Sequence, residues 1–342
     1  MIVMDCGRRN FLYQKGAMTA LFPKRDHGGG LDAAAAEYGG QQEAWLDLST
    51  GINPIAYPVG DLPQEVWSRL PGEGAMARLL QAARAFWSVP DEVEMIAAAG
   101  ASPLIARMPD LAALSGAYIP MPTYNEHAAA FAARGRLNDP RNPKNPVHVY
   151  VHPNNPDGRM WPGSAIGGRP LTIIDESFCD TVPERSHIAR AAEPGVIVLK
   201  SFGKFWGLAG VRLGFAMARP ETFAPVNGKG TLAELMGPWS VSGPALEIGA
   251  RALSDLGWAD TTRVRLGRDA ARLDHLMLTA GAEIVGGTTL FRTYTLREGA
   301  EYWQKRLAAH RIWSRIFPYS TSWIRLGLPG TDEEWARLEA AL

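Results

Sequence analysis

The chain has 342 residues, of which 46% are hydrophobic and 20% are charged, as expected for a globular protein with one large or two interlocked domains. Its 35 basic and 35 acidic residues give a formal net charge of zero, and the basic residues do not gather on one expected element. We therefore predict no nucleic-acid partner and no anionic-membrane surface, and we favour small-molecule chemistry.

The amino terminus and the cysteines indicate the cellular compartment in which the protein is expected. Residues 1–26 lack the apolar core of a secretory signal, and we expect them to form a flexible leader. No stretch approaches the roughly 18 apolar residues of a membrane span. Cys6 and Cys179 cannot build a disulfide framework, and neither lies in a cluster typical of a metal site. A cytoplasmic protein without a metal is the prediction.

Two glycine-containing polar segments flank an alanine-rich helix expected at 31–38. The first, His27 to Gly30, offers free N–H groups and a histidine to an anion, although a plain linker is the alternative. The second, Asp47 to Pro54, contains Gly51, where a backbone can approach a ligand closely. A domain-linking turn is the alternative there.

Alternating helices and strands predict an α/β fold with a parallel sheet covered on both faces. Helices are expected at 63–70 and 73–87, and strands at 93–98, 116–121, 147–151, 171–174 and 196–199. Open α/β sheets bind ligands at the carboxyl ends of their strands. The residues that follow each strand are therefore the candidates for a site.

The first four strands each end beside a candidate residue. Ala101 and Ser102 begin a helix whose free N–H groups suit an anion, or they merely cap that helix. Tyr124 either stacks on a flat ring or closes the core. A proline-stiffened turn presents Asn155. Asp175 would either keep a pyridinium nitrogen protonated or form a salt bridge.

The fifth strand leads to Ser201, Lys204 and Arg212, around which the candidate site is organised. A lysine amine can form a Schiff base with an aldehyde, while a serine hydroxyl and an arginine fork suit a phosphate. Pyridoxal 5′-phosphate carries both groups. Two alternatives remain open: an ordinary surface lysine, and the Ser-x-x-Lys pattern of penicillin-binding serine hydrolases, whose Ser-Asp-Asn and Lys-Thr-Gly motifs this sequence lacks.

The pattern changes after residue 220, where a small α+β domain is predicted. Its expected helices are 242–256, 259–279 and 299–310, and its expected strands are 282–285, 291–296, 312–316 and 323–328. Arg325 is a lone charge in the last strand, so it faces either a ligand carboxylate or a structural partner. We expect a large domain of residues 51–258 and a small domain of residues 27–50 and 259–342.

The order of these candidates resembles that of the fold type I pyridoxal-phosphate enzymes, over about residues 27 to 325. The resemblance implies a three-layer αβα large domain with a mostly parallel sheet, a small α+β domain and a homodimer. It assigns Lys204 to the Schiff base and Asp175 to the pyridine nitrogen. It assigns Asn155 to the ring oxygen O3′ and Tyr124 to stacking on the ring. It assigns the cofactor phosphate to Ala101, Ser102, Ser201 and Arg212. It assigns the substrate α-carboxylate to Arg325.

The amino-terminal segments narrow this resemblance. They are similar to the signature of the threonine-phosphate decarboxylases of cobalamin biosynthesis, relatives of the histidinol-phosphate aminotransferases. Phe178 also favours the decarboxylases, which often carry phenylalanine at this position, whereas general aminotransferases usually carry tyrosine. The resemblance implies substrate contacts from His27, Gly28, Gly51, Ile52, Asn53, Asn155 and Arg325.

The implied reaction is decarboxylation of L-threonine O-3-phosphate to (R)-1-amino-2-propanol O-2-phosphate. A histidinol-phosphate-type aminotransferase is the alternative. A cofactor-binding sensor without turnover is a further one, although fewer than thirty residues precede His27. Leu70 and Gly203 depart from the family pattern, because relatives often carry a tyrosine and a hydroxyl residue at these positions.

Overall fold

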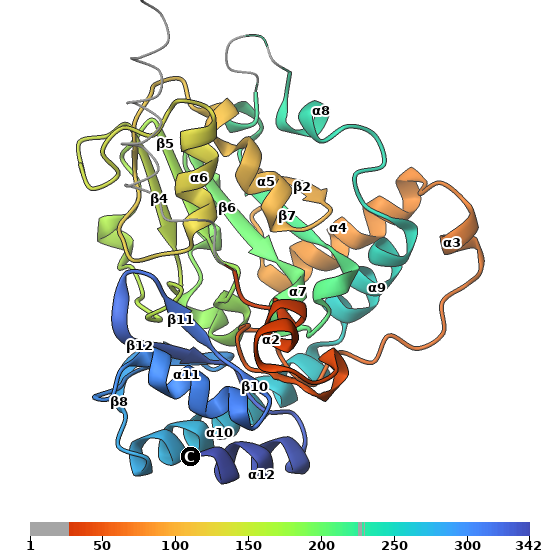
Figure 1. Cartoon of the computed structure of the whole chain (residues 1–342). Helices are drawn as coiled ribbons and strands as arrows, with labels where there is room; N and C mark the ends of the chain where they lie inside the picture. Colours follow the sequence, from red (N-terminus) through yellow and green to blue (C-terminus); the bar gives the residue numbers. More distant parts are fainter. Residues whose placement is uncertain (1–26, 225–227, 229) are drawn as a thin grey trace, which may run out of the picture.

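The computed structural model describes residues 27–224, 228 and 230–342, so the predicted leader and Cys6 lie outside the described residues. A six-stranded sheet with the order β2-β7-β6-β5-β4-β3 forms its centre (Figure 1). β3 to β6 pair in parallel, while β7 runs antiparallel between β6 and β2. The strands are β2 (Glu94–Ala98), β3 (Ala117–Tyr118), β4 (Val147–Val151), β5 (Leu171–Asp175), β6 (Val196–Ser201) and β7 (Gly214–Ala218).

Alternate residues of β6 enter two different hydrophobic clusters. Val196 and Val198 pack with residues of α4 (Glu73–Trp87), α9 (Gly243–Ser254) and α10 (Leu256–Thr279). Ile197 and Leu199 pack on the other side with residues of the helices α5 (Ala101–Arg107), α6 (Asn125–Ala133) and α8 (Leu232–Met236). Since successive side chains of a strand point to opposite faces, the sheet is covered on both. The predicted three-layer, mostly parallel architecture is confirmed.

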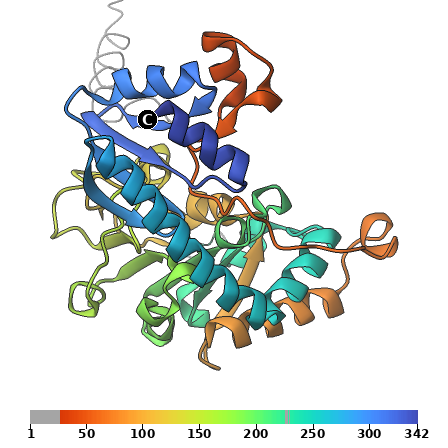
Figure 2. The same cartoon turned by 90° about the horizontal axis from the view of Figure 1, so that it is seen from below.

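The C-terminal part forms a second, antiparallel sheet with the order β11-β12-β9-β8. Its strands are β8 (Glu283–Thr288), β9 (Phe291–Thr295), β11 (Arg315–Phe317) and β12 (Ser320–Leu326), and its helices are α11 (Ala300–Ala309) and α12 (Asp332–Ala341). The N-terminal α2 (Leu31–Tyr38) lies beside this part (Figure 2), and β1 (Leu46–Asp47) pairs in parallel with β10 (Ile312–Trp313). This pairing supports the domain boundaries predicted from the sequence, which stay a prediction.

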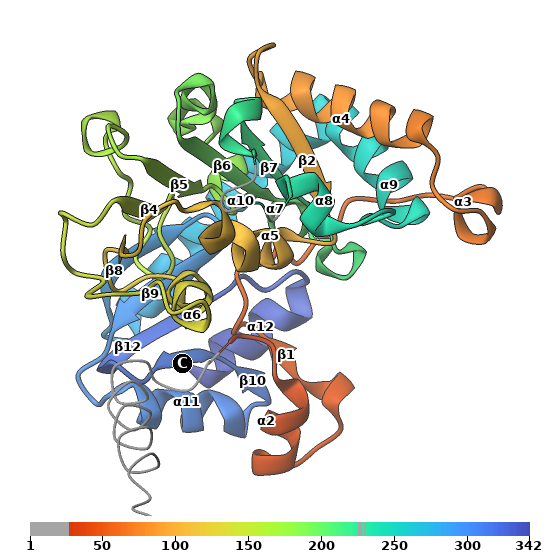
Figure 3. The same ribbon diagram turned by 90° about the horizontal axis from the view of Figure 1, so that it is seen from above.

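Several elements differ from the sequence expectation, and β7, α6 and α8 are among those that were not predicted. The strand expected at 116–121 is reduced to the two residues of β3, and the helix expected at 63–70 to the single turn of α3 (Glu65–Ser68). α3 lies at the end of a projecting arm, where few neighbours stabilise a longer helix (Figure 3). α12 was not predicted, although the capping box of Thr331 and Glu334 marks its start. Among the described helices, none combines the length and apolar character needed to cross a bilayer.

A buried charge cluster lies behind the carboxyl ends of β5 and β6. Lys200 Nζ is 2.6 Å from Glu176 Oε2 and 3.6 Å from Asp180 Oδ1, and all three residues are buried. Burial alone would lower the pKa of Lys200, but the two carboxylates raise it. Burial likewise opposes ionisation of Glu176, but the charge of Lys200 holds the pKa of Glu176 below its ordinary value.

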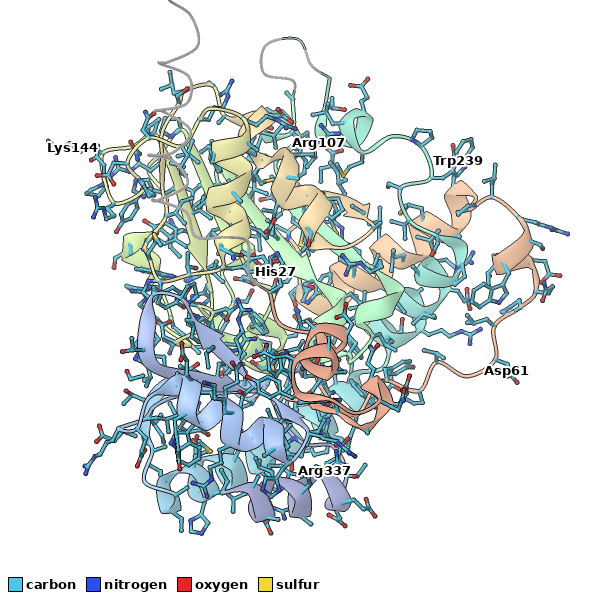
Figure 4. The ribbon with its side chains drawn as sticks, in the orientation of Figure 1. His27, Asp61, Arg107, Lys144, Trp239 and Arg337 are labelled. Carbon is cyan, nitrogen blue, oxygen red and sulfur yellow. The ribbon has the colours of Figure 1, made fainter. Side chains whose placement is uncertain are left out.

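Replacing Lys200 by methionine should lower the free energy of unfolding at pH 7 by about 3 to 5 kcal/mol, because Glu176 then keeps a buried charge without its cation. Urea unfolding of Lys200→Met and wild type measures this loss. Lys144→Met is the control, since Lys144 is exposed at the edge of the molecule (Figure 4). Equal stabilities of the two variants would contradict the expectation.

Candidate active site

Asp175 and Lys204 arrive from neighbouring parallel strands. Asp175 ends β5 opposite Leu199 of β6, and Lys204 lies in α7 (Phe202–Phe205), the single helical turn that directly follows β6. The two charges interact, since the carboxylate raises the pKa of the lysine. The structure therefore brings together the two residues that the sequence proposes for the pyridine nitrogen and the aldehyde.

Asp175 is buried and held in its ionised form by its neighbours. Its Oδ2 lies 2.8 Å from His127 Nε2, and its Oδ1 accepts from the Ser177 amide at 3.0 Å and from the Ser177 hydroxyl. Burial alone would raise the pKa of Asp175, but His127 and Ser177 together hold it below its ordinary value. Such a carboxylate suits a cationic N–H partner.

His127 is a site residue that the sequence reasoning missed. It lies on the first turn of α6, three residues after Tyr124, and is buried. A signal existed, because a histidine one helical turn from a proposed ring-stacking residue shares its helix face. The non-local contact with Asp175 could not be seen in the sequence.

The Lys204 side chain is partly exposed, and its environment disfavours the ammonium form. Desolvation is the largest cause, followed by the positive charges of Arg325 and Arg212, and together they lower the pKa of Lys204 to about 8. Phe178 lies beneath it, with Nζ 5.9 Å from the ring centroid. A lysine of lowered pKa has more of the neutral amine needed to attack an aldehyde.

The residues proposed for the cofactor phosphate meet at one corner of the sheet. Ser201 pairs with Gly214 of β7, and a Cβ on Gly214 would lie 2.4 Å from the Ala101 amide nitrogen. A Cβ on Gly100 would lie 2.5 Å from Arg212 Nη2. Both glycines are therefore needed for these segments to approach one another.

Tyr124 and Ser102 border the same corner. Their side chains are hydrogen-bonded to each other, and Arg212 lies close enough to influence the phenol. Burial first, and then the charges of Asp175 and Glu126, raise the pKa of Tyr124 to about 12. The phenol is therefore neutral at pH 7, and it lies close enough to both Asp175 and Arg212 for their charges to act on it.

Arg325 joins three segments that are distant in the sequence. Its Nη1 donates to Asn155 Oδ1, and its Nη2 donates to the Ser49 carbonyl oxygen, while the guanidinium lies 5.1 Å from the Phe291 ring centroid. Its buried Nε has no hydrogen-bond partner among the described residues. The Nε–H of this desolvated guanidinium is therefore available to an anion, besides the second N–H of each Nη atom.

Arg315 is a second residue that the sequence reasoning missed. It lies opposite Arg325 in the β11–β12 pair. The pKa of Arg325 is lowered to about 10, chiefly by burial and then by the positive charge of Arg315. Two neighbouring guanidinium groups raise each other's free energy unless an anion is bound near them. The alternation of polar and apolar residues in β11 could have suggested Arg315 as a candidate. The sequence does not show, however, that Arg315 pairs opposite Arg325 of β12.

The amino-terminal candidates occupy different positions around the site. His27 Nε2 lies 3.1 Å from Glu126 Oε1, and its ring centroid lies 6.2 Å from that of Tyr124. Figure 4 shows His27 at the junction of the two sheets. A Cβ on Gly28 would lie 2.4 Å from the Ser49 carbonyl oxygen, so this segment packs directly on the loop that Arg325 binds.

The Gly51 to Asn53 loop continues toward Lys204. A Cβ on Gly51 would lie 2.8 Å from Phe291 and 3.0 Å from Phe178, and Ile52 is partly exposed. Asn53 is buried, and its side chain is engaged by the protein itself. The structure thus places Gly51 against Phe178 and Phe291, which lie beside Lys204 and Arg325, while the Asn53 side chain bonds to Phe205, Ile55 and Arg265.

The structure gives a reason for one departure from the family pattern. A Cβ on Gly203 would lie 2.8 Å from Ala209 Cα, so the hydroxyl residue common in relatives has no room here. Leu70, the other departure, is 69% exposed on the arm. Any role of Leu70 toward a cofactor phosphate requires a second chain.

Comparisons with known proteins agree with this geometry. Residues 137–342 match the family model described as aminotransferase class I and II. The chain is 37% identical to a threonine-phosphate decarboxylase from a Sinorhizobium species, over 92% of this chain and 97% of that protein. It is 35% identical to the threonine-phosphate decarboxylase of Pseudomonas aeruginosa, over 93% of this chain and 97% of that protein.

Among solved structures, histidinol-phosphate aminotransferase from Sinorhizobium meliloti in complex with pyridoxal-5′-phosphate has a TM-score of 0.73 at 19% identity, covering 92% of this chain and 94% of that one. The protein is a member of the class I and II aminotransferase family and has the fold type I architecture. Within that family it belongs with the threonine-phosphate decarboxylases, which it matches over nearly its whole length. The family resemblance seen in the sequence is confirmed.

The lowered pKa of Lys204 predicts how stability depends on pH in the cofactor-free protein. Between about pH 8 and 10.5 the unfolded chain binds more protons at this lysine than the folded protein does, so its contribution to the free energy of unfolding rises with pH. Lys204→Met should therefore be more stable than wild type at pH 7, by at most about 3 kcal/mol. Urea unfolding at pH 7 and pH 10 measures both values.

The advantage of Lys204→Met should shrink at pH 10, because the lysine is then largely neutral in the folded protein. An advantage of the same size at both pH values would contradict a lowered pKa and indicate better packing by methionine. Lys144→Met corrects for the general effect of removing a lysine charge.

Proposed function

We propose that the protein is a pyridoxal-phosphate-dependent enzyme that decarboxylates L-threonine O-3-phosphate to (R)-1-amino-2-propanol O-2-phosphate in cobalamin biosynthesis. The near full-length similarity to two threonine-phosphate decarboxylases is the observation that carries this choice of reaction. The site geometry supports the cofactor and the anionic character of the substrate.

The residues present fit pyridoxal 5′-phosphate. Lys204 offers a partly neutral amine to the aldehyde, and the ionised Asp175 offers a partner to the pyridine N–H. Ser201 and Arg212 supply donors for the phosphate, and Gly100 and Gly214 bring these residues and the Ala101 amide together, because a Cβ at either glycine would clash with Arg212 or with that amide. When bound, the cofactor supplies an electron sink for the bond that breaks at the substrate Cα.

The remaining cofactor contacts are proposed from position. Asn155 is held by Arg325 at the end of β4 and is assigned to the ring oxygen O3′. Tyr124 is assigned to stacking, and the Ala101 and Ser102 amides to the phosphate. Phe178 stands where general aminotransferases carry tyrosine, so no hydroxyl acts on the ring from this position.

The substrate carries a carboxylate and a phosphate, and the site offers two adjacent guanidinium groups. Arg325 is assigned to the carboxylate, with its buried Nε among the donors that it can offer. Arg315 and His27 are assigned to the substrate phosphate, because Arg315 pairs opposite Arg325 and the His27 ring lies 6.2 Å from the Tyr124 ring. Gly28, Gly51 and Ile52 complete the proposed contacts. A multiply charged anion bound here would add to the attraction that Asp47 already exerts on Arg325.

Asp175 and Lys204 are the residues that we assign to holding and transferring protons. The Asp175 carboxylate, ionised through His127 and Ser177, holds the proton on the pyridine nitrogen. With the cofactor bound, the Cα–carboxylate bond would break with loss of carbon dioxide, and its electron pair would stay at Cα, delocalised into the cofactor, until a proton reaches Cα. The Lys204 ammonium then delivers a proton to Cα, and a pKa near 8 suits both acceptance and donation near pH 7.

We also propose a homodimer and a cytoplasmic location. The α3 arm exposes Trp67 and Leu70 by 62% and 69%, and a second copy covering the arm would remove this apolar surface from water. The cytoplasmic location rests on the sequence argument alone. Sedimentation equilibrium of the purified protein tests the dimer.

The reaction is tested with L-threonine O-3-phosphate and the cofactor-loaded protein. We expect carbon dioxide and the amine phosphate in equal amounts, at a rate that does not depend on 2-oxoglutarate, and no turnover by Lys204→Ala. Turnover of histidinol phosphate with glutamate formed from 2-oxoglutarate, and no carbon dioxide, would replace the proposal with an aminotransferase. Turnover by Lys204→Ala would remove the assigned role of the lysine.

The substrate fork is tested with Arg325→Lys, which keeps the charge but loses the bidentate geometry. We expect KM for the substrate to rise about tenfold or more, because a lost charge-assisted hydrogen bond is worth about 1.5 to 3 kcal/mol. Arg297→Lys is the control, since the Arg297 side chain is 85% exposed. An unchanged KM in Arg325→Lys would contradict the assignment.

A further inference from the structure

The helical turn that carries Lys204 is too short to stabilise itself. α7 has four residues, and the last carbonyl groups of a helix have no partner within the helix. The Lys204 carbonyl oxygen accepts from the Gly207 amide at 3.3 Å, so the carbonyl oxygens of Phe205 and Trp206 are the ones that need donors from outside the turn. The position of the lysine depends on where those donors lie.

Residues 53–57, named here the strap, supply donors to all three carbonyl oxygens. The Asn53 amide donates to Lys204 O at 3.0 Å, the Asn53 side-chain Nδ2 donates to Phe205 O at 2.9 Å, and the Tyr57 amide donates to Trp206 O at 2.9 Å. The strap runs close against the chain, since a Cβ on Gly207 would lie 2.7 Å from Asn53 O. Asn53 alone contributes two of these three bonds.

Asn53 is in turn held from both sides. Its Oδ1 accepts from the Ile55 amide at 3.1 Å and from Arg265 Nη2 of α10 at 2.6 Å. Arg265 Nη1 is fixed by Asp269 Oδ2 at 3.0 Å. Asn53 is only 2% exposed, so this network lies inside the protein. It links the Lys204 turn to the long helix α10.

We propose that Asn53 is a positioning residue for Lys204, not a substrate contact, and that Arg265 orients the Asn53 side chain for this task. Its hydrogen bonds satisfy the carbonyl groups of the lysine turn and keep the amine at one place. The substrate contact implied for Asn53 by the family resemblance is thereby replaced. The inference rests on the proposed function only where turnover is measured.

Loosening the turn has two consequences. The amine leaves its productive position, and a displacement of about 1 Å can cost about 100-fold in rate. Water also gains access to a lysine whose neighbours are Arg325, Arg212, Asp175 and Asp47. Greater hydration of the amine raises its pKa toward the ordinary value.

The test compares Asn53→Ala with Asn145→Ala. Asn145 is a matched control, because it is 6% exposed, precedes a proline as Asn53 does, and donates from Nδ2 to the Asp139 carbonyl oxygen at 2.8 Å. It adjoins Lys144, which Figure 4 shows at the opposite edge of the molecule from Trp239. Asn53→Ala removes the Nδ2 bond to Phe205 O and the Oδ1 bonds from Ile55 and Arg265, and it leaves the Asn53 amide bond to Lys204 O in place. Asn145→Ala removes the bond to Asp139, which is not part of the lysine turn.

Three quantities are measured for each variant: the free energy of unfolding, kcat and KM for L-threonine O-3-phosphate, and the pH midpoint of Lys204 acetylation by a small anhydride in cofactor-free protein, followed by peptide mass spectrometry. For Asn53→Ala we expect kcat to fall about 10- to 100-fold with KM within about twofold, and the midpoint to move upward from about 8. For Asn145→Ala we expect a stability loss alone.

Two results would overturn the proposal. A raised KM with unchanged kcat would make Asn53 a substrate contact, and equal behaviour of the two variants would leave it a stability residue only. If the protein has no decarboxylase activity, the acetylation midpoint still decides the role of Asn53. If Asn53→Ala does not fold, Arg265→Met tests the same network, with a smaller fall in kcat expected and an unchanged kcat counting against it.

Discussion

Asp175 and Lys204 meet because β5 and β6 run parallel as neighbours, with Asp175 opposite Leu199. The parallel arrangement sends both chain segments out of the sheet at the same edge, so a carboxylate and an amine arrive side by side without any local sequence relation. Buried β-branched residues on both faces hold this pairing in place. The chemistry proposed for the site depends on that register.

Electrostatics then adjust the two groups in opposite directions. His127 and Ser177 keep Asp175 ionised, while desolvation and two arginines reduce the charge of Lys204. A buried ion pair would otherwise lock the lysine as an ammonium group. The separate hydrogen-bond partners of Asp175 leave the amine available, and this is how one small region can hold both a permanent anion and a titrating base.

The site also depends on close contact between the two sheets. Thr293 Oγ1 of β9 donates to the Pro156 carbonyl oxygen at 2.6 Å, and a Cβ on Gly158 would lie 1.9 Å from the Gly287 carbonyl oxygen. The turn that presents Asn155 is therefore seated on the small sheet, from which Arg325 also reaches it. Cofactor-side and substrate-side residues are positioned by the same contact.

The sequence alone predicted strands β2 to β6, a mostly parallel sheet and most of the site candidates, because apolar runs, turns and strand-end polar residues are local patterns, but it missed the antiparallel β7. It did not reveal the His127 contact with Asp175, the register that sets Arg315 beside Arg325, or the use of Asn53 as a donor to the Lys204 turn. These depend on which distant segments pack together. Only the tertiary structure decides them, since hydrogen bonds across 48 to 152 residues leave no periodic trace in the chain.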